Sequence, residues 1–202
     1  MNTRELEIET QYKGFHELVK ITTEHGCQEV VITFNSVCLL IYDPVKRKVL
    51  LTKQFRASRL YNQLIHNHAK PDHEHVNTDG MSIGMVAGRF DVNLTPEALA
   101  VKEALEEVGA VIAEDDVELV NDGQPMMVSS GLTTEMSYLA YIELKPGMVE
   151  ESDQVYGVEE EGEKVTQVWM SLDEFMSKPL EGIRLFAMRE WLRNRLKEKG
   201  EF

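Results

Sequence analysis

Three glutamates in one short segment have the types and spacing that could do chemistry. Glu103, Glu106 and Glu107 are separated by one and three positions, so on a helix they share roughly one face. Like charges this close repel one another, and a cation would relieve the repulsion. Carboxylate and carbonyl oxygens are the ligands of hard divalent cations such as Mg2+ and Mn2+. The functional interpretation of the three glutamates is therefore a metal-binding site, and the alternative is an acidic helix face exposed to solvent.

A helix from Pro96 to Val108 is predicted to position these acids. Thr95 is a capping residue, Pro96 suits the first helical position, and Gly109 is suited to end the helix. An apolar stripe at helical spacing is predicted to face the core, with the glutamates on roughly the opposite side. The stripe consists of Ala98, Val101, Leu105 and Val108.

The spacing around this helix resembles the Nudix box, which is a glycine, five residues, Glu, seven residues and Arg-Glu-apolar-X-Glu-Glu-X-Gly-apolar. Gly88 and the run from Lys102 to Gly109 match it at the same separation. Other segments resemble the nucleoside-diphosphate-sugar branch, which includes UDP-glucose, ADP-ribose and GDP-mannose pyrophosphatases. These segments are Asn35-Ser36-Val37, Lys53-Gln54-Phe55-Arg56, Ser130-Gly131-Leu132-Thr133 and the acidic loop before Val165, so the resemblance runs from about Ser36 to Phe175.

Two positions depart from the box. Leu94 stands where the family has Glu, and Lys102 stands where it has Arg. In the family these two residues form a salt bridge that orients the helix. Because both partners are replaced, no buried charge is left unpaired, and the three glutamates remain. We therefore expect the fold and the activity to be retained.

The resemblance implies which residues form the site. Glu103, Glu106 and Glu107, with the carbonyl of Ala87, would hold Mg2+ or Mn2+, and Gly88 would permit close backbone approach. Substrate binding is assigned to Arg56, Gly88 and Arg89.

A general base is also required. In related ADP-ribose enzymes it lies on an acidic loop that resembles the segment from Glu150 to Glu163, so Glu160, Glu161 or Glu163 is a candidate. Glu103, acting as both ligand and base, is the rival, and a simply solvated loop is the alternative. The loop has few apolar residues to anchor it, so we expect it to be mobile without ligand and to close when metal binds.

The segment from Ala57 to Gly80 lacks periodicity and is predicted to be a long loop. Its histidines form a pattern that could bind zinc, although no cysteine joins them. They are His66, His68, His73 and His75. An insertion that shapes a substrate pocket or a dimer interface is the favoured interpretation.

The order of elements is strands, helix, strands and helices, which predicts an α+β fold. The resemblance specifies a Nudix-type α/β/α sandwich with a mixed sheet. Alternating apolar and polar residues from Leu6 to about Phe34 predict an additional N-terminal antiparallel sheet. We assign residues 1–35 to N-terminal strands that form a dimerisation sheet, since related enzymes exchange such strands, and residues 36–202 to the hydrolase domain.

Charge limits the classes of partner. The 202 residues carry 21 Lys and Arg against 35 Asp and Glu, a net charge of −14. This charge repels nucleic acid and anionic membranes, and the longest apolar run, Val37 to Tyr42, is far too short to span a bilayer. Cys27 and Cys38 are predicted to be buried thiols in neighbouring strands. With a charged N-terminus, we expect a cytoplasmic protein.

The predicted function is metal-dependent hydrolysis of the pyrophosphate bond of a nucleoside diphosphate sugar, giving a nucleoside monophosphate and a sugar phosphate. The alternative is a Nudix-fold module that binds or senses a nucleotide sugar without turnover, which Leu94 and Lys102 favour. Hydrolysis of capped RNA or dinucleoside polyphosphates is less favoured, because the sequence has no basic stripe with stacking aromatic residues.

Overall fold

The protein is described by a computed structural model covering residues 6–66, 79–91, 93–158 and 162–202. Its main sheet has nine strands among these residues, with β11, β12, β5, β4, β10 and β8 in spatial order and β6, β7 and β9 alongside. Strands β4 and β10 pair in parallel, and the other ladders between described strands of this sheet are antiparallel. The mixed sheet is therefore confirmed. The strands are β4 (Ser36–Asp43), β5 (Lys48–Phe55), β6 (Met81–Gly84), β7 (Val86–Arg89), β8 (Glu118–Leu119), β9 (Met126–Met127), β10 (Met136–Glu143), β11 (Val155–Tyr156) and β12 (Val165–Ser171).

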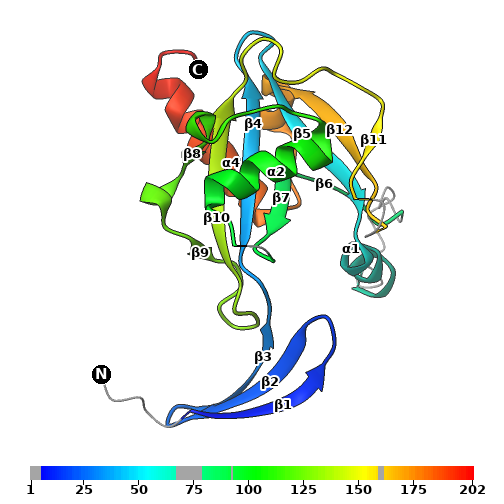
Figure 1. The fold of residues 1–202 in the computed structure, drawn as a ribbon, viewed down its shortest axis with the longest axis vertical. Helices are drawn as coiled ribbons and strands as arrows, with labels where there is room; N and C mark the ends of the chain where they lie inside the picture. Colours follow the sequence, from blue (N-terminus) through cyan, green and yellow to red (C-terminus); the bar gives the residue numbers. More distant parts are fainter. Residues whose placement is uncertain (1–5, 67–78, 92, 159–161) are drawn as a thin grey trace.

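Helices cover both faces of this sheet (Figure 1). Because successive strand residues point to opposite faces, β4 supplies Val37, Leu39 and Ile41 to the core beneath α2 (Pro96–Val108). Its alternate residues Cys38, Leu40 and Tyr42 enter the core beneath α3 (Leu172–Ser177) and α4 (Ile183–Glu198). The predicted α/β/α sandwich is confirmed, and two short 3-10 turns, η3 (Glu114–Asp116) and η4 (Asn121–Gly123), complete it.

Helix α2 has the predicted bounds and caps. The hydroxyl of Thr95 accepts a hydrogen bond from the Ala98 N–H at 3.1 Å, and Gly109 takes a left-handed φ of 66° at the end of the helix. The predicted core stripe is confirmed at Val108, which is buried, and at Val101, which packs against the core, but it is wrong at Leu105, which is 54% exposed. The small side chains of Ala100 and Ala104 are buried instead, and they permit close packing of the helix on the sheet. The full buried set is Leu99, Ala100, Ala104, Glu107 and Val108.

A second, three-stranded antiparallel sheet hangs below the main body in Figure 1. It consists of β1 (Glu7–Lys13), β2 (Glu17–Thr23) and β3 (Gly26–Ile32). The backbone of Val31 joins it to the segment before β10, through hydrogen bonds with Leu132 and Thr134 of 2.8 and 3.1 Å. Cys27 lies here and is exposed, so only Cys38 meets the prediction of a buried thiol. The reason is that β3 belongs to this open sheet, while β4 is central in the main one.

The predicted loop after β5 begins instead as helix. Residues Ala57–Tyr61 form α1, and Asn62–His66 continue it as a π-helical turn, η1. The buried Gln63 accepts a hydrogen bond from the Gly80 N–H at 3.2 Å and so holds this turn against the returning chain. The side chain of His66, and all of His68, His73 and His75, lie outside the described residues, and the zinc hypothesis stays a prediction. Among the described helices, none combines the length and apolar character needed to cross a membrane.

Candidate active site

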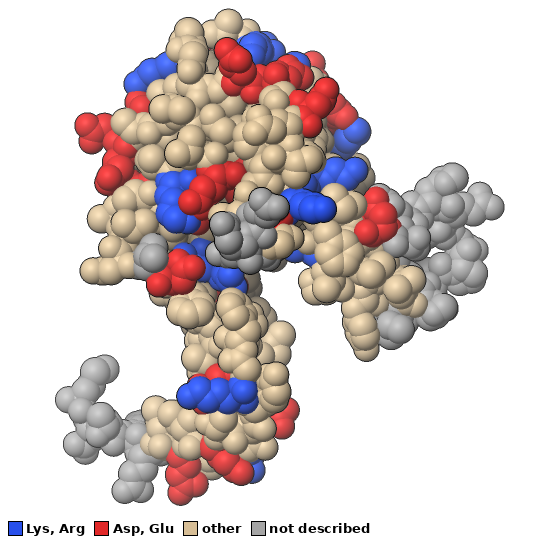
Figure 2. Space-filling model, turned by 45° about the vertical axis from the view of Figure 1, so that its right-hand side comes forward, with Lys and Arg blue, Asp and Glu red and all other residues tan. Residues whose placement is uncertain are grey.

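A cleft of about 370 Å³ opens where α2 faces β7. It collects predicted site residues from four elements or loops, together with others that no motif indicated. The predicted lining residues are Arg56, Ala87, Gly88, Arg89, Glu103, Glu106 and Glu163. Figure 2 shows acidic and basic side chains interspersed on the face it presents. Glu107 lies beneath the cleft rather than in its lining, and Glu160 and Glu161 lie outside the described residues.

Gly88 allows α2 to approach β7. A Cβ atom at this position would lie 2.3 Å from the Cγ, Cδ and Oε1 atoms of Glu103. No side chain can occupy that space without displacing the glutamate. The sequence assigned Gly88 to close backbone approach, and the group that approaches it here is the carboxylate of Glu103.

Glu107 is the buried acid of the group. Its side chain accepts a hydrogen bond from the Ala87 N–H at 3.0 Å, and the residue is only 1% exposed. Burial raises the pKa of Glu107 to about 8, because desolvation and the charges of Glu163 and Glu103 outweigh the Ala87 N–H and Arg56. Burial likewise raises the pKa of Glu103. Two carboxyls with this preference for the neutral form indicate a place where additional positive charge is stabilising.

This burial predicts a pH-dependent stability for the metal-free protein. The pKa of Glu107 rises from 4.5 to about 8 on folding, so the folded state binds more protons between these values. The contribution of Glu107 to the free energy of unfolding is therefore greatest below pH 4.5. It falls as the pH rises towards 8, by at most about 1.4 kcal/mol per pH unit. Chemical denaturation from pH 5 to 8 in a chelator measures the slope. Glu107→Gln should flatten it, and an unchanged slope in that variant would contradict the assignment.

Lys102 lies across the other two carboxylates. Its Nζ donates to Glu106 Oε2 at 2.6 Å and to Glu103 Oε1 at 3.3 Å. Burial lowers the pKa of Lys102, but the hydrogen bond and charge of Glu106 and the charge of Glu103 outweigh it, so the pKa is raised overall. Among the described residues, no three Asp, Glu, His or Cys side chains are grouped so that they could hold a metal ion as they stand. Glu107 is turned to β7, and an ammonium occupies the side of Glu103 and Glu106.

The chemistry of the donors nevertheless fits a hard divalent cation. Glu103 and Glu106 present oxygens to the cleft, Ala87 contributes backbone to its wall, and Glu107 places a further buried carboxyl directly below. These are the oxygen ligands that Mg2+ and Mn2+ take. A cation there would also offset the like charges that raise the pKa values of Glu103 and Glu107.

The acidic segment that leads to Glu163 is anchored by polar contacts. Strand β11 pairs with β12, and the Gly157 N–H donates to the carbonyl of Glu106 at 3.0 Å. The amide of Gln167 donates to the carbonyls of Val108 and Glu150, at 2.8 and 3.1 Å. Backbone and amide hydrogen bonds therefore anchor residues 150–158, where the sequence offers few apolar residues to do so. Mobility of the loop without ligand, and its closure when metal binds, stay predictions.

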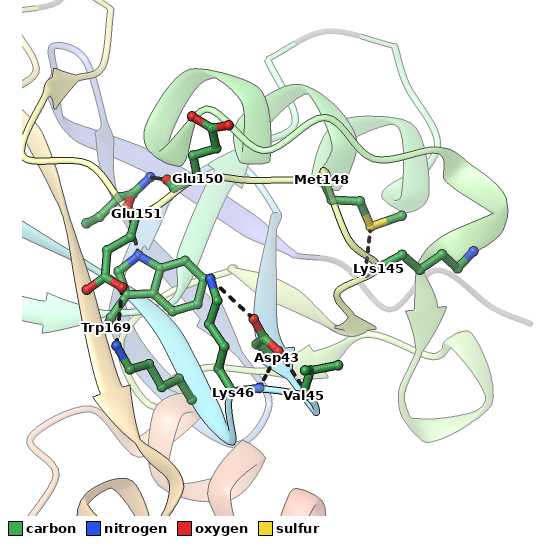
Figure 3. A network of polar contacts seen from close by, with 10 residues as sticks. Asp43, Val45, Lys46, Lys145, Met148, Glu150, Glu151 and Trp169 are labelled. Carbon is green, nitrogen blue, oxygen red and sulfur yellow. Dashed lines mark hydrogen bonds and ion pairs between the residues drawn. The ribbon is translucent and has the colours of Figure 1, made fainter.

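The start of the same segment is fixed on the side of the sheet that α2 covers. The carboxylate of Glu151 pairs with Lys48 at 3.2 Å, and Lys46 lies over the Trp169 ring, 5.1 Å from its centroid (Figure 3). Lys46 also pairs with Asp43 at 3.7 Å. The chain therefore reaches β11 from a fixed starting point. Glu163, which follows residues 159–161 outside the described part of the chain, contributes to the cleft wall.

Sequence reasoning missed Arg184, the second residue of α4. Its Nη1 donates to Glu135 Oε1 at 2.8 Å and to the buried Ser36 hydroxyl at 3.2 Å. Arg184 and Glu135 line the cleft with Arg56 and Arg89. An isolated arginine at the start of a C-terminal helix carries no motif, so only the fold brings it to the site. Three arginines thus line the same cleft as the carboxylates, and arginine is suited to binding phosphate oxygens.

Comparison with known proteins identifies the family of the chain. A family model described as the NUDIX domain matches residues 32–192. A GDP-mannose pyrophosphatase of Salmonella arizonae is 30% identical over 141 residues, covering 70% of this chain and 63% of that protein. One of Salmonella paratyphi B is 36% identical over 87 residues, covering 43% of this chain and 38% of that protein. The aligned part is thus less than two thirds of either relative.

A solved structure has the same fold. The crystal structure of an ADP compounds hydrolase matches with a TM-score of 0.64 at 17% identity, covering 98% of this chain and 96% of that one. The resemblance noted in the sequence is confirmed, since the family model covers more than half of the chain. The protein therefore belongs to the Nudix family.

Proposed function

We propose that the protein hydrolyses the pyrophosphate bond of a nucleoside diphosphate sugar, releasing a nucleoside monophosphate and a sugar phosphate. The observation that carries this proposal is one cleft lined both by carboxylates of α2 and by Arg56, Arg89 and Arg184. A pyrophosphate needs both a metal seat and fixed positive charge. The names of the relatives, GDP-mannose pyrophosphatase and ADP compounds hydrolase, support a nucleotide-linked substrate.

We assign the site residues three roles according to their chemistry: metal ligands, phosphate-binding groups and a general base. Glu103, Glu106 and Glu107, with the carbonyl of Ala87, would hold Mg2+ or Mn2+, which when bound neutralises phosphate charge and lowers the pKa of the attacking water. Arg56, Arg89 and Arg184 orient the phosphates through their planar donor groups. A carboxylate at the cleft wall accepts the proton of the water, and Glu163 is our first choice, with Glu103 as the rival.

A substrate panel with Mg2+ tests this function. GDP-mannose, UDP-glucose, ADP-ribose and a capped RNA are each incubated with the protein, and products are separated by anion-exchange chromatography. We expect a nucleoside monophosphate and a sugar phosphate from at least one nucleotide sugar, and no cleavage of capped RNA. Binding of a nucleotide sugar without any product would instead favour the binding module, the alternative that the Lys102 contacts with Glu103 and Glu106 support.

We also propose that residues 1–35 form a dimerisation sheet and residues 36–202 the hydrolase domain. Strand β1 has an unpaired edge among the described strands, and it carries the exposed side chains of Ile8 and Tyr12, at 62% and 65%. An exposed edge with apolar side chains favours pairing with a second copy. Phe15, at the tip of this sheet, lies against the cleft residue Arg89, 4.7 Å from ring centroid to guanidinium carbon.

The dimer gives a direct prediction. Light scattering at micromolar concentration should give about twice the chain mass of 23.1 kDa. Ile8→Glu, which places charge on the exposed face, should shift the protein towards the monomer, whereas Val45→Glu, at an exposed apolar position in the β4–β5 turn, should not. A monomeric wild-type mass excludes the dimer.

A further inference from the structure

Lys102 holds an unusual place for a surface lysine, because the groups it pairs with are two of the acids proposed to bind metal. Its ammonium is 2.6 Å from Glu106 Oε2 and 3.3 Å from Glu103 Oε1, and its side chain is 40% exposed at the wall of the cleft. These are its ion pairs within the described part of the chain. The oxygens that it engages are therefore the ones that a cation in the cleft would need.

The neighbouring sequence explains why the lysine turns inward. Leu94 stands at the box position whose glutamate pairs with residue 102 in the family, and as an apolar residue, 38% exposed, it supplies no carboxylate. Within α2, Glu106 is four positions after Lys102, the spacing at which helical side chains meet. The repulsion among Glu103, Glu106 and Glu107 favours any cation placed between them.

We propose that Lys102 is an internal counter-cation that occupies the metal side of Glu103 and Glu106 and must leave when a divalent cation binds. This inference rests on the metal site of the proposed function. An ammonium this close to the carboxylate oxygens repels a divalent cation at the same place, so the two cations compete for the metal side of Glu103 and Glu106. Lys102 therefore stabilises the metal-free site and weakens metal binding, two effects of opposite sign.

Metal binding without substrate tests the competition. Mn2+ affinity is measured by electron paramagnetic resonance at one fixed pH for wild type, Lys102→Met, Lys102→Arg and Lys178→Met. We expect Lys102→Met to bind Mn2+ about tenfold more tightly, since the competing charge is gone, and Lys102→Arg to stay within about threefold of wild type. Lys178 is the matched control, because it pairs with Glu174 four positions earlier and is not among the residues that line the cleft.

Thermal unfolding in a chelator supplies the second measurement. Lys102→Met should unfold at a lower temperature than wild type without metal, and should gain more than wild type when Mn2+ is added. If Lys102 had only a structural role, replacing it with Met would lower both the stability of the protein and its affinity for Mn2+. Unchanged or weaker Mn2+ binding by a folded Lys102→Met protein therefore overturns the inference.

A third experiment uses the unmodified wild-type protein and covers the case in which the variant fails to fold. Amine-reactive labelling followed by mass spectrometry reports the accessibility of each lysine. Adding Mn2+ should increase labelling of Lys102 severalfold and leave Lys178 unchanged, whereas constant or reduced labelling of Lys102 overturns the inference. If wild type binds no Mn2+, the proposed metal site fails, and the inference with it. If Mn2+ binds but Lys102 does not respond, only the inference fails.

Discussion

Glu106→Gln and Glu107→Gln should each lower turnover at least ~100-fold at limiting Mg2+, while the protein stays folded. Both changes remove a charged oxygen from the proposed metal seat but keep the size of the side chain. In Glu107→Gln the amide oxygen can still accept the hydrogen bond from the Ala87 N–H, and the cost of burying a charge disappears. We therefore expect lost activity with equal or higher stability, measured by steady-state kinetics and chemical denaturation.

Glu97→Gln is the matched control for these two variants. Glu97 is in the first turn of the same helix and does not line the cleft, so its loss should leave turnover nearly unchanged. Wild-type turnover in a Glu106→Gln or Glu107→Gln protein at limiting Mg2+ would exclude that residue as an essential ligand. A fall in activity that rising Mg2+ fully restores would instead indicate weakened metal binding, as expected for a ligand.

Glu163→Gln should lower kcat ~100-fold or more with little change in KM, if Glu163 accepts the proton of the attacking water. Glu163 lines the cleft, and its charge contributes to the raised pKa values of Glu103 and Glu107. The carboxylate of Glu163 therefore lies in the same cleft as the acids of α2 and interacts electrostatically with them. A lost proton acceptor slows the chemical step, whereas binding contacts made by the arginines remain.

Glu160→Gln and Glu161→Gln belong in the same series, since both were predicted from the sequence as alternatives. Glu151→Gln is the control, because Glu151 pairs with Lys48 and lies outside the cleft lining. If the three single variants of Glu160, Glu161 and Glu163 and their triple combination keep full activity, the base lies elsewhere, and Glu103→Gln is the next variant to examine.

The sequence alone determined the features that depend on neighbouring residues. Thr95, Pro96 and Gly109 set the ends of α2, because capping and left-handed backbone are local preferences. The segment from Ser36 to Tyr42 was predicted to be a central strand, and β4 is buried on both of its faces. The box spacing from Gly88 to Glu107, with the other matching segments, predicted the family and the fold, and it indicated Glu103 and Glu106, which line the cleft. The metal-binding role of these acids stays a prediction.

Only the tertiary structure decided which atoms share the site and how buried they are. The periodicity of α2 put Leu105 inside and Glu107 outside, and packing of Ala100 and Ala104 on the sheet reversed both. Arg184 reaches Ser36 across 148 positions of the chain, so no local spacing could indicate the contact. Local preferences act through bonds between near neighbours, whereas burial, pKa and ion-pair choice depend on residues that only folding brings together.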